Sequence, residues 1–167
     1  MSLVFEGEFE SERPPEELWD YFTDIDVLAS CAPGLKEINQ LSPSEFEAVV
    51  SVGVGSVKPT FNVEGVVVEM EHPEKLVLQG KGKGGRKGSF EATGTMQLTE
   101  TDDGTLLKWK AEGSVSGLIA SLGQRALSGV TDRLANDFFE CMESKIIEGV
   151  PASPDFTEVN DDDPSSD

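Results

Sequence analysis

Few residues in this chain could carry nucleophilic or metal chemistry. Its 167 residues include two cysteines, Cys31 and Cys141, and one histidine, His72. Most metal sites and most Ser-His or Cys-His mechanisms need more of these residue types than the chain contains. Two cysteines are also too few for a disulfide framework. We therefore expect a protein that is not an enzyme, with no catalytic residue, no metal site and no cofactor.

The segment CAPGLKEI at 31–38 raises the question of a reactive thiol. Pro33 and Gly34 could shape a loop around Cys31, but no histidine is available to pair with a thiolate. A thiol at the end of a helix also faces the negative end of the helix dipole, which disfavours the thiolate. We interpret the segment as the corner where a helix ends and a strand begins. Cys31 and Pro33 are then expected at the entrance of an interior cavity.

The segment GKGKGG at 80–85 matches the pattern G-x-G-x-x-G of dinucleotide-binding proteins. That function requires a helix directly after the glycines, because the helix N-terminus holds the pyrophosphate. The residues that follow, SFEATGTMQL, alternate between apolar and polar side chains as a strand does. We predict a hairpin between two strands and no nucleotide site.

Four basic residues lie in and next to this hairpin, Lys81, Lys83, Arg86 and Lys87, in a chain with only 13 bases against 32 acids. Two interpretations stay open. The four residues could form a patch that docks an acidic partner or a lipid headgroup. They could equally offset neighbouring acidic residues without any binding role.

Acidic residues dominate the composition and give a net charge of −19. Such a surface repels nucleic acid, because binding there depends on Lys and Arg neutralising phosphates. It also suits a high-salt cytoplasm, where salt screens self-repulsion, so we hypothesise a halophilic source. With no apolar run of about 18 residues and no signal peptide, we predict a cytoplasmic protein that reaches a membrane only through a partner. The acidic residues 150–167 are predicted to form a disordered tail.

The periodicity of the apolar residues predicts one α+β domain over residues 1–149. A strand at 3–9 precedes two short helices, and only strands follow between Leu35 and Val115. A helix is predicted from Leu118 to Glu148, with a bend at Gly123 or Gly129. Its sheet-facing stripe contains Leu127, Val130, Leu134, Phe138 and Cys141. The predicted order is β-α-α-β6-α, a long final helix packed across a curved antiparallel sheet.

Glycines within the predicted strands favour a sheet that bends sharply around the helix. Such a sheet leaves a cavity where large side chains do not fill the space. The residues expected to line this cavity are almost all apolar: Phe46, Val50, Val52, Phe61, Phe90, Met96, Trp109, Leu118 and Leu122.

Four segments together resemble the CoxG family of carbon monoxide dehydrogenase subunits. They are RPPEELWDYFTDIDVLASCAPGLKEI, VGVGSVKPTF, GKGKGGRKGSFEATGTMQL and LLKWKAEGSVSGLIASLGQR. The resemblance implies the START-like helix-grip fold of the SRPBCC superfamily. It also implies a non-catalytic accessory protein whose hydrophobic cavity takes a quinone or lipid-like molecule. The implied partner is a molybdenum CO dehydrogenase-type enzyme, which the family serves in assembly, membrane recruitment or quinone and lipid handling.

Some members of that family resemble membrane-tethered proteins through an extended C-terminus. The tail of this chain contains no apolar segment, so we expect no direct transmembrane anchor. Two alternatives remain. One is a polyketide cyclase- or dehydratase-like enzyme that uses the same cavity, and the other is an assembly factor that uses only its surface.

Overall fold

The computed structural model describes residues 1–149, and the tail predicted at 150–167 lies outside the described residues. The strands are β1 (Ser2–Ser11), β2 (Leu35–Ser42), β3 (Glu45–Ser51), β4 (Thr60–Glu71), β5 (Lys75–Lys83), β6 (Ser89–Thr101) and β7 (Gly104–Ser116). The α-helices are α1 (Pro15–Thr23), α2 (Ile25–Cys31) and α3 (Gly123–Glu148), and two short 3-10 helices are η1 (Gly85–Lys87) and η2 (Leu118–Leu122).

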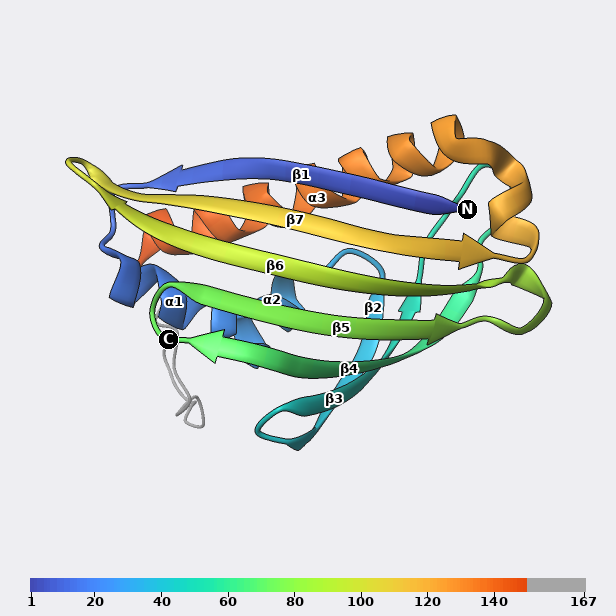
Figure 1. Cartoon of the computed structure of the whole chain (residues 1–167), viewed down its shortest axis with the longest axis horizontal. Coiled ribbons are helices and arrows are strands. Elements are labelled where there is room, and N and C mark those ends of the chain that lie inside the picture. Colours follow the sequence, from blue (N-terminus) through green and yellow to red (C-terminus); the bar gives the residue numbers. More distant parts are fainter. Residues whose placement is uncertain (150–167) are drawn as a thin grey trace.

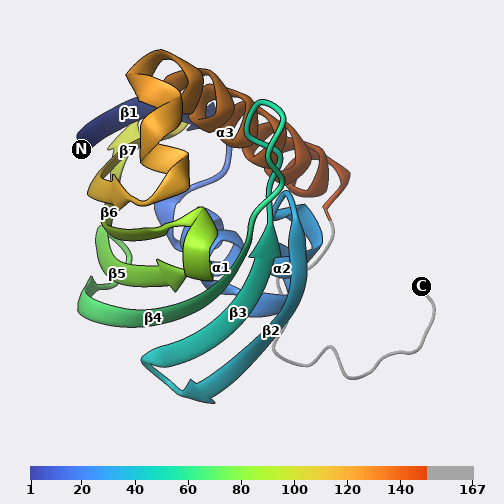
Figure 2. The same cartoon turned by 90° about the vertical axis from the view of Figure 1, so that its right-hand side faces the viewer.

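The seven strands form one antiparallel sheet in the order β1-β7-β6-β5-β4-β3-β2 (Figure 1). Viewed from its end, the sheet curls around the interior, and α3 lies along its open side (Figure 2). The helices α1 and α2 connect β1 to β2, which are the two edge strands. The predicted α+β helix-grip architecture, β-α-α-β6-α, is confirmed.

The core forms between the inner face of the sheet and α3. Leu76, Leu98 and Leu107 project from three neighbouring strands toward Met142 and Ile146 of α3, and all five are buried. In β1 the glutamates Glu6, Glu8 and Glu10 occupy the alternate, exposed positions. The period-2 pattern of the sequence therefore separates a buried face from a charged one, as expected for a sheet covered on one side.

The final helix does not begin at Leu118 as predicted. Residues Leu118–Leu122 form η2, and α3 begins only at Gly123. Gly123 has φ of +89°, a left-handed conformation that interrupts a right-handed helix and that glycine adopts without steric cost. The bend predicted at Gly123 or Gly129 thus occurs at Gly123, whereas Gly129 lies inside α3.

The chain after Ser51 also differs from the prediction of one long strand. Residues 52–59 form a loop closed by an isolated bridge between Val54 and Val57. Gly55 in this loop has φ of +62°, which turns the chain back. Val54 is buried against Leu3 and Leu127, so the loop packs on the first half of α3.

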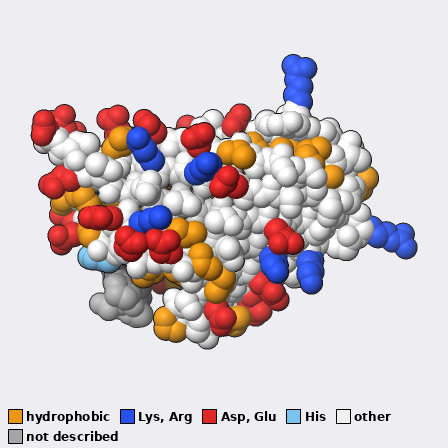
Figure 3. Space-filling view, viewed as in Figure 1, with side chains coloured by type: hydrophobic (Ala, Val, Ile, Leu, Met, Phe, Trp, Pro, Cys, Tyr) orange, Lys and Arg blue, Asp and Glu red, His pale blue; other side chains and the backbone are white. Residues whose placement is uncertain are grey.

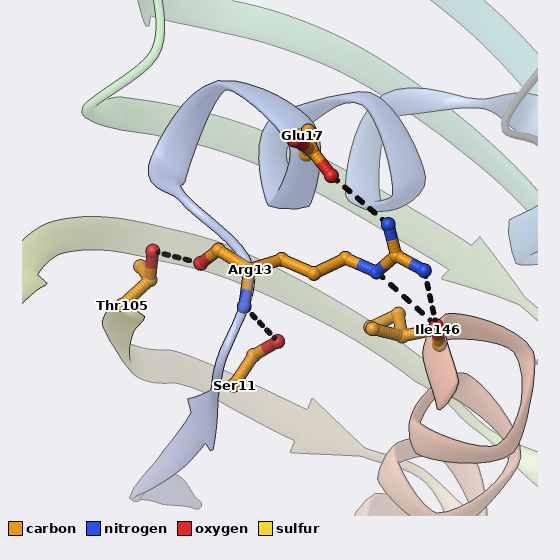
Figure 4. A network of polar contacts seen from close by, with 5 residues as sticks. All are labelled: Ser11, Arg13, Glu17, Thr105 and Ile146. Carbon is orange, nitrogen blue, oxygen red and sulfur yellow. Dashed lines mark hydrogen bonds and ion pairs between the residues drawn. The ribbon is translucent and has the colours of Figure 1, made fainter. Parts of the chain in front are cut away.

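Arg13 connects the two ends of the domain (Figure 4). Its Nε and Nη2 groups donate to the carbonyl oxygen of Ile146 at 3.1 and 2.8 Å, and its Nη1 donates to Glu17 at 2.9 Å. The hydroxyl of Thr105 donates to the carbonyl of Arg13 at 2.7 Å, and the hydroxyl oxygen of Ser11 accepts from the Arg13 amide at 3.1 Å. The last carbonyls of a helix lack partners within it, so the guanidinium caps α3 and fixes its end against α1.

Candidate functional site

A cavity of about 390 Å³ lies between the middle of the sheet and α3. Its lining residues come from α1, α2, β5, β6, β7 and α3. They are Phe22, Leu28, Leu76, Leu78, Gly94, Thr95, Met96, Leu107, Trp109, Lys110, Ala111, Thr131, Leu134, Ala135, Phe138 and Phe139. Most of these residues keep partial accessibility to solvent, unlike the fully packed Leu107 beside them. The interior is therefore incompletely filled by the protein's own side chains.

Aromatic rings close one end of the cavity. The rings of Phe22 and Phe138 lie 6.2 Å apart, and Phe138 and Phe139 meet edge to face at 5.1 Å. Trp109 stacks on Phe139 at 5.9 Å, and Phe9 also stacks on Phe139, at 5.5 Å. Rings at these separations attract one another beyond the area they bury, so this wall is rigid.

Small residues leave the space open at the centre of the sheet. Gly80 of β5 pairs with Ala92 of β6, and Gly94 of β6 pairs with Ala111 of β7, all on the face toward α3. A Cβ atom at Gly94 would meet no heavy atom within 4 Å, and one at Gly80 would meet only a carbonyl oxygen at 3.9 Å. The cavity thus exists because the sequence places glycine and alanine where a packed core would have larger side chains.

Polar side chains are scarce in this lining. The Thr131 hydroxyl donates to the Leu127 carbonyl at 2.9 Å, so its proton is already bonded. Lys110 and Thr95 occupy outward-facing positions of β7 and β6 and contribute their backbone, and the Lys110 ammonium lies 3.7 Å from Glu112. The cavity can hold apolar matter by burial and shape, and it offers an ionised group no charged partner among the described residues.

The carboxyl groups with shifted pKa values lie elsewhere, at exposed positions near the end of β4. A hydrogen bond with Glu69 raises the pKa of Glu71, and the same bond, together with one from Lys75, lowers the pKa of Glu69. The Lys75 ammonium lies 3.4 Å from the Glu69 carboxylate. None of the three residues lines the cavity.

The structure places two of the nine expected cavity residues, Met96 and Trp109, in this lining. Phe46 instead covers Gly65 on the inner face of the sheet, and Phe61 and Phe90 pair with each other at 5.2 Å. Four others also lie outside this lining: Val50, Val52, Leu118 and Leu122.

Those residues lie elsewhere because the 52–59 loop and η2 fold inward at one end. Val52 and Leu122 pack there with Leu3, Val54 and Leu127 in a second cluster that closes the sheet. This closure leaves the open volume nearer the second half of α3. Leu118 is 45% exposed.

Sequence reasoning missed most of the lining from the helices. Phe22, Leu28 and Phe139 were not expected there, and neither were Leu76 and Leu78. The signal for two further residues was present, because Leu134 and Phe138 belong to the helix stripe predicted to face the sheet. A stripe that faces a glycine-rich strand should have indicated that part of the cavity.

Cys31 and Cys141 form a disulfide between α2 and α3, with their Cα atoms 5.4 Å apart. This corrects the expectation of two free cysteines. The packing of α2 on α3 brings together residues that are 110 positions apart in sequence, which no local spacing reveals. Cys31 is buried and Pro33 is half-buried, while Leu28, one helical turn before Cys31, lines the cavity.

The four basic residues of the predicted patch are all exposed, and the hairpin prediction for GKGKGG is confirmed. Lys81 and Lys83 lie on β5, and Arg86 and Lys87 lie on η1. The strand β6 follows directly, so no helix N-terminus is present there to hold a nucleotide.

Comparison with known structures places this fold among helix-grip proteins. A conserved protein from Geobacillus kaustophilus is 29% identical, with a TM-score of 0.81, and the match covers 88% of this chain and 97% of that chain. The protein Ara h 8.0201 is 16% identical, with a TM-score of 0.65 and coverage of 89% and 99%. The Zhui aromatase/cyclase from Streptomyces sp. R1128 is 12% identical, with a TM-score of 0.63 and coverage of 90% and 99%. The last two likenesses show the fold alone.

Sequence comparison gives a narrower result. No curated protein matches the chain. Within residues 1–149, no helix has both the length and the apolar character needed to cross a bilayer. The family model for the carbon monoxide dehydrogenase subunit called CoxG matches residues 7–147, most of the chain and every strand and helix of the sheet and its cover. The chain belongs to the CoxG family.

Proposed function

We propose that this protein is a non-catalytic accessory protein that binds a hydrophobic small molecule in the cavity between the sheet and α3. The observation that carries the proposal is the unfilled apolar space above Gly94, enclosed by Trp109, Met96 and Phe138. Ligand pockets have volumes of about 300–1,000 Å³ and are lined mainly by apolar and aromatic side chains. The volume of about 390 Å³ falls at the small end of that range.

The lining favours a ligand with a flat ring, such as a quinone, or a lipid-like chain. A ring can lie against Trp109 and Phe138, because offset aromatic contacts are attractive. The path over Gly94 and Ala111 has no side chain to obstruct a narrow apolar group. Carbonyl or hydroxyl groups of such a ligand would remain near the partly exposed rim, because an unpaired polar group is costly to bury.

The proposed partner is a molybdenum CO dehydrogenase-type enzyme. The name of the family describes a component of carbon monoxide dehydrogenase, and the chain matches that family over residues 7–147. We propose that the protein serves such an enzyme in assembly, in membrane recruitment or in handling its quinone or lipid.

A cyclase- or dehydratase-type activity would need an ionisable group inside the cavity, since proton transfer requires a positioned acid or base. The polar side chain that lines the described cavity from α3 is Thr131, whose hydroxyl is bonded to Leu127. The Zhui aromatase/cyclase shares the fold at 12% identity, which is no support for shared chemistry. The lining therefore favours binding over catalysis.

Native mass spectrometry of the protein as purified tests the proposal. We expect a population heavier than the polypeptide by one small apolar molecule, which an organic extract of the same sample then identifies. Harsher ionisation should release this mass, since apolar contacts weaken in the gas phase once water is removed. Protein that carries no added mass, and that takes up none when mixed with a quinone or a fatty acid, would contradict it.

A further inference from the structure

One end of the molecule is built from three chain segments that contain no acidic residue. They are residues 48–63, 76–90 and 113–131. At this end η1 contacts η2, and Val54 of the first segment packs on Leu127 of the third. The whole chain contains 32 acids, so their absence from three converging segments creates a surface unlike the rest of the protein.

Five exposed basic residues occupy these segments, and we call them the basic pole. They are Lys58, Lys83, Arg86, Lys87 and Arg125. The ion pairs among the described residues involve other bases, namely Arg13, Lys75 and Lys110. The charges of the basic pole are therefore available to an external partner.

The sheet register separates Lys83 from Lys81, two residues earlier. Lys81 lies between Glu64 and Glu91 on the neighbouring strands. Lys83 lies between Asn62 and Ser89, which are uncharged. Of the two interpretations left open by the sequence, a local offset of acids explains Lys81 and does not explain Lys83.

An apolar side chain stands beside these bases. Leu118 of η2 is 45% exposed, whereas its neighbour Ile119 is buried. Gly117 and Gly123 flank η2 with φ of +82° and +89° and turn this short helix out from the end of the sheet. Because η2 contacts η1, Leu118 lies near Arg86 and Lys87.

The acidic majority of the protein acts only weakly at this end. Glu100, Asp102 and Asp103 lie at the β6–β7 hairpin, at the far end of the 13-residue strand β6. A strand of that length spans roughly 40 Å, about five times the screening length of about 8 Å at physiological salt. Figure 3 shows acidic side chains gathered toward the hairpin end and basic side chains projecting at the opposite end. The net charge of −19 therefore does not decide what the basic pole attracts.

We infer that the basic pole docks on an anionic lipid bilayer, with Leu118 entering the headgroup boundary. A bilayer requires no complementary shape, and each nearby Lys or Arg raises binding about fivefold, the equivalent of about 1 kcal/mol. A protein interface would normally contain a larger apolar centre with aromatic residues, and the exposed apolar group here is one leucine. The inference does not depend on the proposed ligand, because the cavity lies between this end and the far hairpin.

Flotation with vesicles tests the inference on the full chain. Vesicles of phosphatidylcholine and phosphatidylglycerol in equal parts should carry the protein at about 0.1 M salt and release it near 1 M, where screening is nearly complete. Vesicles of phosphatidylcholine alone should carry little. The combined variant Lys83→Gln, Arg86→Gln and Lys87→Gln should bind about a hundredfold more weakly, about fivefold for each base.

A matched control removes three other bases, by Lys81→Gln, Lys108→Gln and Lys110→Gln. These lysines face acidic cross-strand neighbours, such as Glu8 opposite Lys108 and Glu6 opposite Lys110. The control has the same net charge as the test variant and should bind vesicles nearly as well as the parent protein. Equal losses in the two variants, or no binding of the parent to anionic vesicles, would overturn the inference. Binding only to an acidic protein would do the same.

Leu118→Ser keeps the charges and removes the apolar contact. It should weaken vesicle binding several-fold and leave its salt dependence unchanged, because the number of contacting bases is unaltered. All variants should unfold at the parent's denaturant concentration, since the substituted side chains are exposed. Uptake of a hydrophobic probe in solution should also stay unchanged, so a failure here is distinguishable from a failure of the proposed cavity function.

Discussion

Gly94→Leu is expected to weaken binding of a hydrophobic probe by at least tenfold without destabilising the protein. Gly94 faces the cavity, and a side chain there would meet open space rather than a neighbouring atom. The added leucine would occupy the space that we propose for the ligand. Removing a glycine from a strand interior also stabilises the fold by about 0.5–1 kcal/mol. A fluorescence titration with N-phenyl-1-naphthylamine measures the affinity, and urea unfolding measures the stability.

Gly129→Leu is the matched control for that variant. Gly129 lies in α3 at an exposed position, and a Cβ there would also meet no atom within 4 Å. The same chemical change should therefore raise helix stability by up to about 1 kcal/mol and leave probe binding as it is. If Gly94→Leu binds the probe as tightly as the control does, the ligand site is not in this cavity.

Removing the disulfide should produce the largest loss of stability. The bond joins residues 110 positions apart, and closing a loop of about 100 residues restricts the unfolded chain by about 4.7 kcal/mol in the chain-entropy account. We expect Cys31→Ala with Cys141→Ala to lower the free energy of unfolding by about 3–5 kcal/mol, at the upper part of the usual range. Urea unfolding of the oxidised protein and of the double variant measures the difference.

Dithiothreitol provides the internal control for this result. It should shift the unfolding midpoint of the parent protein toward that of the double variant, and it should leave the variant unaffected. Thiol titration of the denatured, unreduced parent should detect no free thiol, since both cysteines are bonded. Two free thiols in that titration would show that the bond between α2 and α3 does not form.

The overall fold could be predicted because its signals are local. Alternation in β1 and β6 gives strands with one buried face, and the stripe containing Leu134 and Phe138 gives a sheet-facing helix. Glycine conformation also explains a boundary, since Gly123 separates η2 from α3. These properties depend on neighbours a few residues away, which the sequence displays directly.

The cavity lining and the disulfide could not be predicted in the same way, because both depend on tertiary packing. Val52 and Leu122 are as apolar as the true lining, but the inward fold of the 52–59 loop places them in the second cluster. The pairing of Cys31 with Cys141 depends on how α2 approaches α3. A hydrophobic residue in the sequence indicates burial, and only the packing decides whether it fills space or surrounds it.

Energy transfer from Trp109 tests the central claim most directly. The chain contains two tryptophans, and Trp109 lines the cavity whereas Trp19 is buried near His72, outside the lining. Trp19→Phe keeps an aromatic ring at that buried position and leaves Trp109 as the sole donor. After bound lipid has been removed on a hydrophobic resin, titration with N-phenyl-1-naphthylamine should quench Trp109 in a saturable, one-to-one manner. Quenching that never saturates, or that persists unchanged in Gly94→Leu, would contradict a ligand-binding cavity.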